Sequence, residues 1–266
     1  MAGMGAALVT GGWRGIGRAV VERLLAGGWQ VAMSYVPGGA EPLDAIDAWC
    51  RATPALTAHP LDLREGGSIR ACLAEVRQAF GGLDLLVNNA GVGSATVAMF
   101  SGEPAEQDAL MLAINAAGTL AMCRGFMDLP ATRPGPRKLV NLSSVGGGIA
   151  TFPGFSLADG MSKSAIAHLT RQLAAETVHA GVDVFALCPG ATDTEMFRQS
   201  TLNHLSEAER AEFLAGLPKG RLIRPEEIAE VVAYLALPGS TVLHGAVIDA
   251  SMGLGVRPGL VAERRH

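Results

Sequence analysis

The sequence predicts an α/β fold in which a doubly wound parallel sheet carries helices on both faces. Short apolar runs of strand length alternate with longer segments of helical period, as crossover connections between parallel strands require. Glycine pairs such as Gly27-Gly28 and Gly81-Gly82 end the helical segments. No repeat, low-complexity stretch or linker divides the chain. We therefore expect residues 1–266 to form a single domain.

The expected strands are short and apolar, which suits positions buried between two helical layers. In chain order they are Ala6–Thr10, Gln30–Tyr35, Ala55–Pro60, Leu83–Val87, Lys138–Leu142, Val182–Leu187 and Ala246–Asp249. The expected helices lie between these strands, and one of them carries a proline in its first turn, where no helical hydrogen bond is lost. In chain order they are Ile16–Ala26, Glu41–Arg51, Ser68–Phe80, Pro104–Phe126, Asp159–Ala180 and Pro225–Leu235.

The composition restricts the partners. Hydrophobic residues make up 49% of the chain, charged residues 17%, and the formal net charge is −4. Because Arg264-Arg265 is the nearest approach to a basic tract, we expect a small-molecule substrate, and neither nucleic acid nor a membrane. No signal peptide or membrane-length apolar stretch is evident, so a cytoplasmic location is expected. The cysteines are widely spaced, which favours reduced core thiols over disulfides or a metal site.

A glycine-rich turn joins the first strand to the first helix. Its residues read Thr10-Gly11-Gly12-Trp13-Arg14-Gly15-Ile16-Gly17. Glycines allow the backbone to turn tightly and approach a pyrophosphate, whose charge the helix N-terminus attracts. A glycine cluster alone is weak evidence, but its place between a strand and an apolar helix favours a dinucleotide site.

The turn resembles the Thr-Gly-x-x-x-Gly-x-Gly pattern of the short-chain dehydrogenase/reductase family, whose members have a Rossmann-type sheet. Arg224-Pro225-Glu226-Glu227-Ile228-Ala229 is similar to the start of the family's late helix. Other motifs follow in the family's order, and the resemblance implies dinucleotide contacts there. They are Asp62 and Leu63 after strand three, Asn89, Ala90 and Gly91 within an Asn-Asn-Ala-Gly element, and Pro189, Gly190, Thr192 and Thr194 near the nicotinamide.

The cofactor is predicted to be NADP(H). An NAD site commonly places an acid after the second strand to bind the ribose 2′-hydroxyl. Here that strand ends in Ser34-Tyr35, and no acid occurs before Glu41. Arg14 in the turn supplies a cation that can hold the 2′-phosphate.

The resemblance also implies a catalytic group that includes Ser144, Asn115 and Lys163. In the family, a tyrosine four residues before the lysine exchanges a proton with the substrate oxygen, which the serine holds. The lysine lowers the pKa of the phenol and binds the nicotinamide ribose, and the asparagine carries a water of the proton relay. In this chain the corresponding residue is Asp159, and the tyrosines Tyr35 and Tyr234 are expected far from it.

Asp159 changes the expected chemistry. An aspartate has an ordinary pKa of about 3.9, and the ammonium of Lys163 one helical turn away favours the charged form, so a proton is rarely present at pH 7. A protonated imine needs no acid, and a fixed anion would stabilise it. We therefore predict an NADPH-dependent reductase that transfers hydride to an activated C=N group. We expect this reaction to belong to a biosynthetic pathway.

Other hypotheses remain open. The protein could be a ketone reductase that takes its proton through Lys163, Asn115 and water. It could be a non-redox cyclase, dehydratase or epimerase, or an inactive dinucleotide-binding protein. Asp159 could also serve only as the N-cap of the helix that follows.

The substrate is expected between Val145–Phe155 and a lid at about residues 195–221. Both segments carry apolar side chains, which favours a bulky hydrophobic substrate, although the lid could equally pack on itself. The resemblance implies a homotetramer or dimer that forms through the helices at Pro104–Phe126 and Asp159–Ala180. The tail from Leu254 to His266 could reach a neighbouring subunit.

Overall fold

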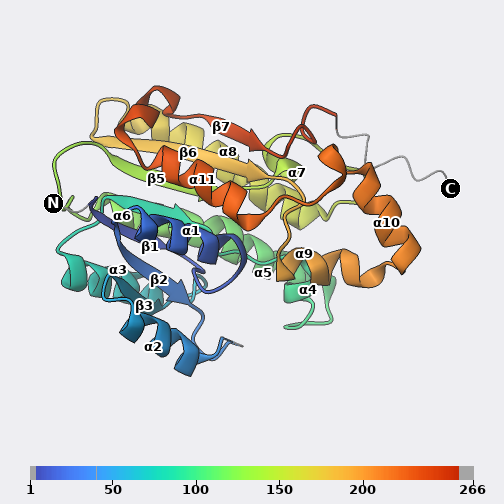
Figure 1. The fold of residues 1–266 in the computed structure, drawn as a ribbon, viewed down its shortest axis with the longest axis horizontal. Helices are drawn as coiled ribbons and strands as arrows, with labels where there is room; N and C mark the ends of the chain where they lie inside the picture. Colours follow the sequence, from blue (N-terminus) through green and yellow to red (C-terminus); the bar gives the residue numbers. More distant parts are fainter. Residues whose placement is uncertain (1–3, 40, 258–266) are drawn as a thin grey trace.

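The computed structural model describes residues 4–39 and 41–257, and its centre is one seven-stranded parallel sheet (Figure 1). The strand order is β3-β2-β1-β4-β5-β6-β7, which confirms the predicted doubly wound fold. The strands are β1 (Ala6–Val9), β2 (Gln30–Tyr35), β3 (Leu56–Pro60), β4 (Leu85–Asn88), β5 (Arg137–Leu142), β6 (Val182–Pro189) and β7 (Val247–Ala250).

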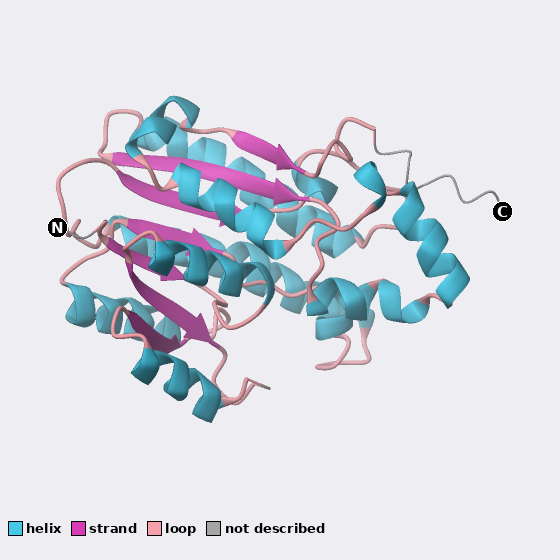
Figure 2. Ribbon diagram, in the orientation of Figure 1, coloured by secondary structure: helices cyan, strands magenta, loops and turns pink. Residues whose placement is uncertain are grey.

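Helices cover both faces of the sheet (Figure 2). On one face α1 (Gly15–Ala26) packs against α11 (Pro225–Leu235), and α2 (Leu43–Ala52) adds Ile46 to the same core. On the other face a second core gathers residues of α3 (Gly66–Phe80), α6 (Thr119–Met127) and α8 (Leu157–Thr177). The residues of β1, β2, β4, β5 and β6 alternate between these two cores, as a sheet covered on both faces requires.

The predicted helix at residues 104–126 is interrupted in its middle. It consists of α5 (Pro104–Leu112), a π-helix (Ala113–Gly118) and α6. A Cβ at Gly118 would lie 2.7 Å from Leu63 Cβ, so the glycine permits a close approach of the loop after β3. Short π-helical turns are frequent at functional sites, and this one contains Asn115.

An 18-residue window within Pro104–Met127 has a mean hydropathy of 1.4, so this helical stretch is long and apolar enough to cross a membrane by length and composition alone. The sequence-based expectation concerned about 20 uncharged apolar residues, and this stretch carries Glu106, Asp108 and Arg124. In the structure the stretch is part of the α/β fold, because α5 packs on α8, and α6 packs on α3 and β4. A helix that covers a parallel sheet needs much the same apolar composition as a membrane helix.

Several short helices that were not predicted lie at the carboxyl ends of the strands (Figure 1). They are α4 (Ser94–Val97), α7 (Val145–Gly148), α9 (Glu195–Ser200) and α10 (Glu207–Gly216), with 3₁₀ turns at Leu202–His204 and Pro218–Gly220. A further 3₁₀ turn, Pro238–Leu243, precedes β7 at the opposite ends of the strands. Most are too short to show a helical hydrophobic period. The exception is α10, whose capping box of Ser206 and Glu209 is visible in the sequence.

Candidate active site

The glycine-rich turn between β1 and α1 has the shape of a phosphate cradle. Gly11 and Gly15 have φ values of 64° and 55°, which glycine adopts readily and other residues rarely do. A Cβ at Gly17 would lie 2.5 Å from Asn89 Nδ2, so only a residue without a side chain fits at this point. The first turn of α1 has no side-chain cap, so its N–H groups can receive an anion. These features fit a dinucleotide pyrophosphate.

Side chains from three strand ends hold the turn in place. The Ser34 hydroxyl accepts from Gly11 N at 3.1 Å, and Asn89 Nδ2 donates to Thr10 O at 2.9 Å and to Gly11 O at 3.1 Å. The Thr10 hydroxyl accepts from the backbone N–H groups of Asn89 and Ala90. Ser34 and Asn89, predicted as cofactor contacts, therefore use these polar groups to shape the turn. Thr10 was named only as the first residue of the turn. The hydrogen bonds of its hydroxyl were not predicted, because their partners lie far away in the chain.

Arg14 lies at the end of this turn, between two carboxylates. Its guanidinium is 3.3 Å from Glu195 Oε2 and 3.9 Å from Glu41 Oε1. The absence of a nearby acid was part of the case for NADP(H), and the loop after β2 brings Glu41 back to the turn. The separation of Arg14 and Glu41 along the chain gave no indication that the two side chains lie close together.

Asp62, the predicted adenine contact, is held by Arg64. Arg64 Nε and Nη2 donate to the two carboxylate oxygens at 2.9 and 2.5 Å, and these hydrogen bonds lower the pKa of Asp62. The Arg64 guanidinium also lies 5.7 Å from the centre of the Phe100 ring. The carboxylate is therefore fixed at the carboxyl end of β3, beside the predicted adenine position.

Other predicted cofactor contacts pack mainly against the protein. The Trp13 ring meets Trp49 at a centroid distance of 6.1 Å, while Ile16 and Tyr35 pack against the core beneath α1. Leu63 is buried against Gly118. Trp13, Ile16 and Tyr35 remain partly exposed, so they are still able to contact a ligand.

The segment after β6 approaches the glycine turn. Gly190 packs on Ser251, and the buried Thr192 hydroxyl donates to Gly190 O, directly after Pro189. The Thr194 side chain caps α9, and a Cβ at Gly15 would lie 3.2 Å from Thr194 Cγ2. This contact brings the predicted nicotinamide and pyrophosphate segments together.

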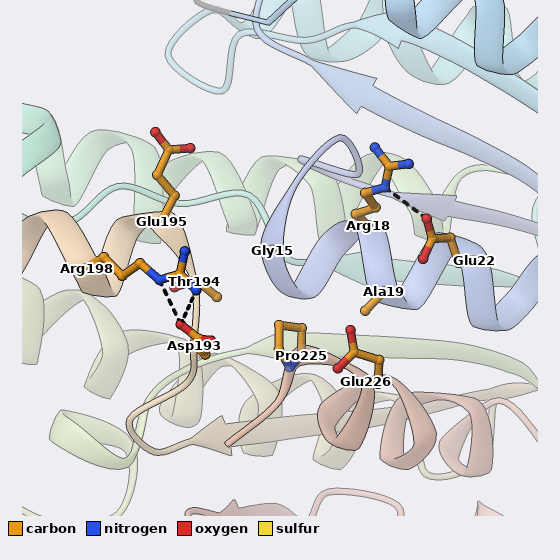
Figure 3. Close-up of a pocket in the computed structure, with 10 residues that line it drawn as sticks. All are labelled: Gly15, Arg18, Ala19, Glu22, Asp193, Thr194, Glu195, Arg198, Pro225 and Glu226. Atoms are coloured by element: carbon orange, nitrogen blue, oxygen red, sulfur yellow. Dashed lines mark hydrogen bonds and ion pairs between the residues drawn. The ribbon is translucent and has the colours of Figure 1, made fainter. Parts of the chain in front are cut away.

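A cavity of about 300 Å³ lies beside this contact (Figure 3). It runs between the start of α1, the segment Asp193–Arg198 and the start of α11. Figure 3 shows the Glu195 carboxylate pointing away from the ion pair of Asp193 and Arg198. The lining includes the glycine turn at Gly15 and does not reach Asp159, so the cavity belongs to the phosphate end of the site.

Asn115 and Lys163 meet at Gly91, at the end of β4. A Cβ at Gly91 would lie 3.0 Å from Asn115 Oδ1 and 3.6 Å from Lys163 Nζ. The buried Asn115 side chain accepts from Val92 N at 2.8 Å, and donates to Val92 O at 2.9 Å and to Ser162 Oγ at 3.2 Å. Both amide hydrogens and one lone pair of the amide oxygen are thus used in joining the π-helix, the loop after β4 and α8.

The two serines at the end of β5 have different surroundings. The Ser143 hydroxyl donates to Lys163 O at 2.8 Å and ties β5 to α8. The Ser144 hydroxyl accepts from Gly146 N at 3.2 Å, which leaves its own proton available. This difference agrees with the choice of Ser144 as the residue that faces a substrate.

Asp159 stands in the first turn of α8, one turn before Lys163. The N-cap of α8 is Ser156, whose hydroxyl accepts from Asp159 N at 3.3 Å. The alternative in which Asp159 is the N-cap is therefore wrong. Asp159 Oδ1 is buried without a hydrogen-bond partner, an expensive condition for a carboxylate. Its side chain is half-buried and is left free for another role.

Burial governs the ionisation of both residues. It raises the pKa of Asp159, and the Lys163 ammonium offsets this only in part. Burial also lowers the pKa of Lys163, against the opposing effects of Asp159 and Cys188. From sequence we expected the lysine to dominate and to lower the pKa of Asp159, and the direction is the reverse.

Cys188 is a site neighbour that was interpreted only as a core thiol. A Cβ at Gly148 would lie 2.7 Å from both Cys188 Sγ and Ser143 Oγ. Burial raises the pKa of the Cys188 thiol to about 11, so it is protonated at neutral pH. Its position directly before the Pro-Gly motif is the sequence signal that could have identified it.

Apolar side chains surround the catalytic group unevenly. Phe155 packs on Gly146 and Gly160, and Met196 packs on Gly93, and both side chains are partly exposed. Phe197 instead pairs with Phe213, and Leu202 is buried. Part of the predicted lid therefore packs on itself, and Phe155 and Met196 are the residues left to meet a ligand.

Comparison with known proteins agrees with this arrangement. A family model described as enoyl-(acyl carrier protein) reductase matches residues 11–255. The 2-(R)-hydroxypropyl-CoM dehydrogenase of Xanthobacter autotrophicus is 31% identical, over 91% of this chain and 95% of its own. The acetoacetyl-CoA reductase of Rhizobium meliloti is 33% identical, over 93% of this chain and 97% of its own.

Solved structures are similar over nearly the whole chain. An actinorhodin polyketide ketoreductase variant with NADPH has a TM-score of 0.82 and 29% identity, over 96% of this chain and 99% of its own. The 3-oxoacyl-[acyl-carrier protein] reductase of Brucella melitensis with NAD has a TM-score of 0.81 and 27% identity, over 95% and 97%. The chain therefore belongs to the short-chain dehydrogenase/reductase family and is an NAD(P)-dependent oxidoreductase.

Proposed function

We propose that this protein is an NADP(H)-dependent carbonyl reductase that interconverts a ketone and a secondary alcohol. The substrate is a bulky, largely hydrophobic small molecule. The observation that carries the proposal is Asp159, a carboxylate with a buried, unpartnered oxygen one helical turn before Lys163. It stands where the family has its tyrosine, at the centre of a group that is otherwise complete.

The relatives favour a carbonyl over the C=N group that the sequence suggested. An acetoacetyl-CoA reductase and a polyketide ketoreductase are named for the reduction of ketones, and a hydroxypropyl-CoM dehydrogenase for the reverse reaction. Family membership also favours a redox reaction over a cyclase, a dehydratase or an inactive binding protein. We therefore prefer a ketone substrate, which was an alternative hypothesis in the sequence analysis.

The raised pKa of Asp159 weakens the main objection to a ketone substrate. The objection was that Lys163 would keep the carboxyl too acidic to donate a proton. Burial raises the pKa of Asp159 instead, and a less acidic carboxyl holds its proton closer to neutral pH. In this proposal the Asp159 carboxyl donates its proton to the substrate oxygen, and Lys163 and Asn115 replenish it through water.

Each neighbour has a distinct part in the proposed mechanism. Ser144 donates a hydrogen bond to the substrate oxygen and keeps its proton, and Lys163 binds the nicotinamide ribose. Because both amide hydrogens of Asn115 are used and its Oδ1 already accepts one hydrogen bond, we assign the relay water to its backbone carbonyl in the π-helix. When bound, the dinucleotide supplies the hydride. Phe155 and Met196 bind apolar parts of the substrate and exclude water.

The preference for NADP(H) is supported by Arg14. Its guanidinium lies at the entrance of the glycine turn and can form charge-assisted hydrogen bonds with a 2′-phosphate. Solved relatives have been obtained both with NADPH and with NAD, so the family allows either cofactor.

A second candidate function keeps the cationic C=N substrate. The observation that favours it is the same Asp159 Oδ1, since a buried carboxylate oxygen without a donor attracts a protonated imine. In that case Asp159 acts in its ionised form. Its raised pKa then opposes the reaction, because it disfavours that form.

Substrate pairs with similar skeletons distinguish the two functions. Purified protein and NADPH are mixed with α-tetralone or with 3,4-dihydroisoquinoline, and nicotinamide absorbance is followed. Oxidation of NADPH by the ketone, and of the corresponding alcohol by NADP⁺, supports the carbonyl reductase. Oxidation by the imine alone supports the second candidate. Lys163→Ala provides the background rate.

The protein is also proposed to act as a single cytoplasmic domain that assembles into dimers or tetramers. A groove of about 520 Å³ between α6 and α8 is lined by Leu120, Met127, Leu169 and Leu173 together with charged residues. Such a mixed surface suits helix pairing between subunits. The expectation for the C-terminal tail concerns mainly residues outside the described ranges.

A further inference from the structure

The two acids beside Arg14 come from different parts of the chain and differ in exposure. Glu195, the first residue of α9, has an exposed side chain and a second partner in Gln199 Nε2 at 2.9 Å. Glu41 lies in the loop between β2 and α2, and its side chain is only 11% exposed although that of Arg14 is 57% exposed. Arg14 therefore faces one exposed carboxylate that solvent screens and one that the protein shields from water.

We propose that Glu41 determines how strongly the protein discriminates between NADP(H) and NAD(H). Its carboxylate competes with the 2′-phosphate for Arg14, and it accepts a hydrogen bond from the free 2′-hydroxyl of NAD(H). This inference rests on the proposed dinucleotide site. It assigns a role to a residue that lies outside the motifs that identified that site.

The position of Glu41 follows from how the turn is attached to β2. Gly12 N donates to Ser34 O at 3.1 Å and Gly11 N to Ser34 Oγ, so the end of β2 and the turn form one wall. In dinucleotide-binding α/β folds the adenosine ribose lies against this wall. An anion that binds Arg14 Nη2 must approach the Glu41 carboxylate, which is 3.9 Å from the same nitrogen.

Because the protein shields its side chain from water, Glu41 should affect dinucleotide binding more than Glu195 does. Exposed ion pairs are screened by water and salt, and contribute little. A carboxylate removed from water interacts more strongly with nearby charge. A phosphate of roughly two negative charges meets this repulsion, whereas a hydroxyl meets an acceptor. Removing the charge of Glu41 should therefore shift the two affinities in opposite directions.

The test is calorimetric binding of NADP⁺ and NAD⁺, without substrate, to the wild type and to Glu41→Gln. The expected result is about tenfold tighter binding of NADP⁺ and severalfold weaker binding of NAD⁺, from the removal of one shielded charge. Glu195→Gln is the matched control and should change the ratio of the affinities by no more than about twofold. Arg14→Gln should weaken NADP⁺ at least about tenfold and spare NAD⁺. Thermal melts verify that each variant is folded.

An unchanged ratio in Glu41→Gln would overturn the proposal, as would weaker binding of NADP⁺, which would mean that Glu41 only orients Arg14. An equal effect of Glu195→Gln would also contradict it. If the wild type binds neither nucleotide, the proposed function fails together with this inference. If both bind with a ratio that Glu41→Gln leaves unchanged, only the inference fails.

Discussion

Asp159 is the residue on which the proposed chemistry depends, and the protein holds it in a costly state. Its Oδ1 is buried without a donor, and burial raises the pKa of the carboxyl more than Lys163 lowers it. A carboxylate kept unsatisfied near a buried lysine is typical of functional sites, where stability is given up for reactivity.

The first prediction is that Asp159→Asn stabilises the protein at neutral and alkaline pH. The pKa of Asp159 is raised in the folded state, so folding disfavours the ionised form at pH values above that pKa. A neutral amide removes this cost, and a gain of about 1 kcal/mol is typical of single stabilising changes. The gain should disappear at acidic pH, once the carboxyl is protonated in both states.

Urea unfolding at pH 8 and at pH 4 measures this difference. Asp108→Asn is the matched control, since Asp108 is exposed on α5, and its stability should change little at either pH. A loss of stability at pH 8 in Asp159→Asn alone would show that Asp159 supports the fold.

Contacts between residues at a fixed spacing in one helix could be predicted from the sequence. Contacts between residues that loops bring together could not. Lys163 follows Asp159 by one helical turn, so their proximity was evident. Glu41 and Cys188 depend on how a loop and a strand end approach the site, for which spacing gives no measure. The direction of the pKa shift of Asp159 also depends on burial, which only the packed structure reveals.

At the scale of elements, close contact between α7 and α8 holds the catalytic group together. Gly147 has a φ of 88° and lies against the backbone of Gly160, and its carbonyl accepts from Ser164 Oγ at 2.7 Å. Ser144 immediately precedes α7, and Asp159 immediately precedes Gly160. The glycine contact therefore sets the separation of these two side chains.

The second prediction concerns Gly147→Ala. The new Cβ would collide with the Gly160 backbone, where the carbon atoms lie 3.0 Å away, and would force α7 from α8. We expect a loss of at least about 3 kcal/mol in stability and at least about tenfold in kcat/KM. Gly154→Ala is the matched control, because Gly154 has a φ of 77° with no atom within 4 Å of a Cβ. It should cost only about 1–2 kcal/mol, the strain of the left-handed backbone.

Equal effects of the two substitutions on activity would contradict the role given to this contact. The contact itself could not be predicted, since a run of glycines at residues 146–148 indicates only a flexible loop. The π-helix around Asn115 was also missed, because the helical period of residues 104–126 continues through it almost unchanged.

At the scale of the whole molecule, the sheet separates a site at the carboxyl ends of its strands from a stabilising cluster at the opposite ends. Lys138 at the start of β5 is buried and binds Asp183 Oδ2 at 2.6 Å, with Ser240 and Thr241 hydroxyls at 3.1 Å. The cluster joins β5 and β6 to the turn that leads to β7. It has no contact with the catalytic group.

The third prediction is that Lys138→Met destabilises the protein without changing its chemistry. Removing Lys138 leaves the Asp183 carboxylate buried without a cation, although the Thr241 hydroxyl still donates to Oδ2 at 2.6 Å, and should cost about 3–5 kcal/mol. Adding Asp183→Leu should recover much of this loss. Arg23→Met, which removes an exposed pair with Glu230, should cost less than about 1 kcal/mol. Denaturant unfolding measures stability, and kcat/KM of the variants below their melting temperatures should stay within about twofold of the wild type.

The fold of the whole molecule was predictable because every strand and long helix carries its own apolar pattern. Right-handed crossovers between parallel strands restrict the possible strand orders, but the order itself came from the structure. The short helices at the carboxyl ends carry no such pattern, and they surround the proposed site. Substrate and cofactor preference are therefore the properties for which the sequence was least informative.

The most direct test of the central claim is the pH dependence of single-turnover NADPH oxidation by a ketone substrate, in the wild type and in Asp159→Asn. If the Asp159 carboxyl donates the proton, the wild-type rate falls as pH rises through its raised pKa. Asp159→Asn then loses at least about 10²-fold in rate and no longer shows that fall. A variant that reduces the ketone at the wild-type rate, with the same pH profile, would contradict the account.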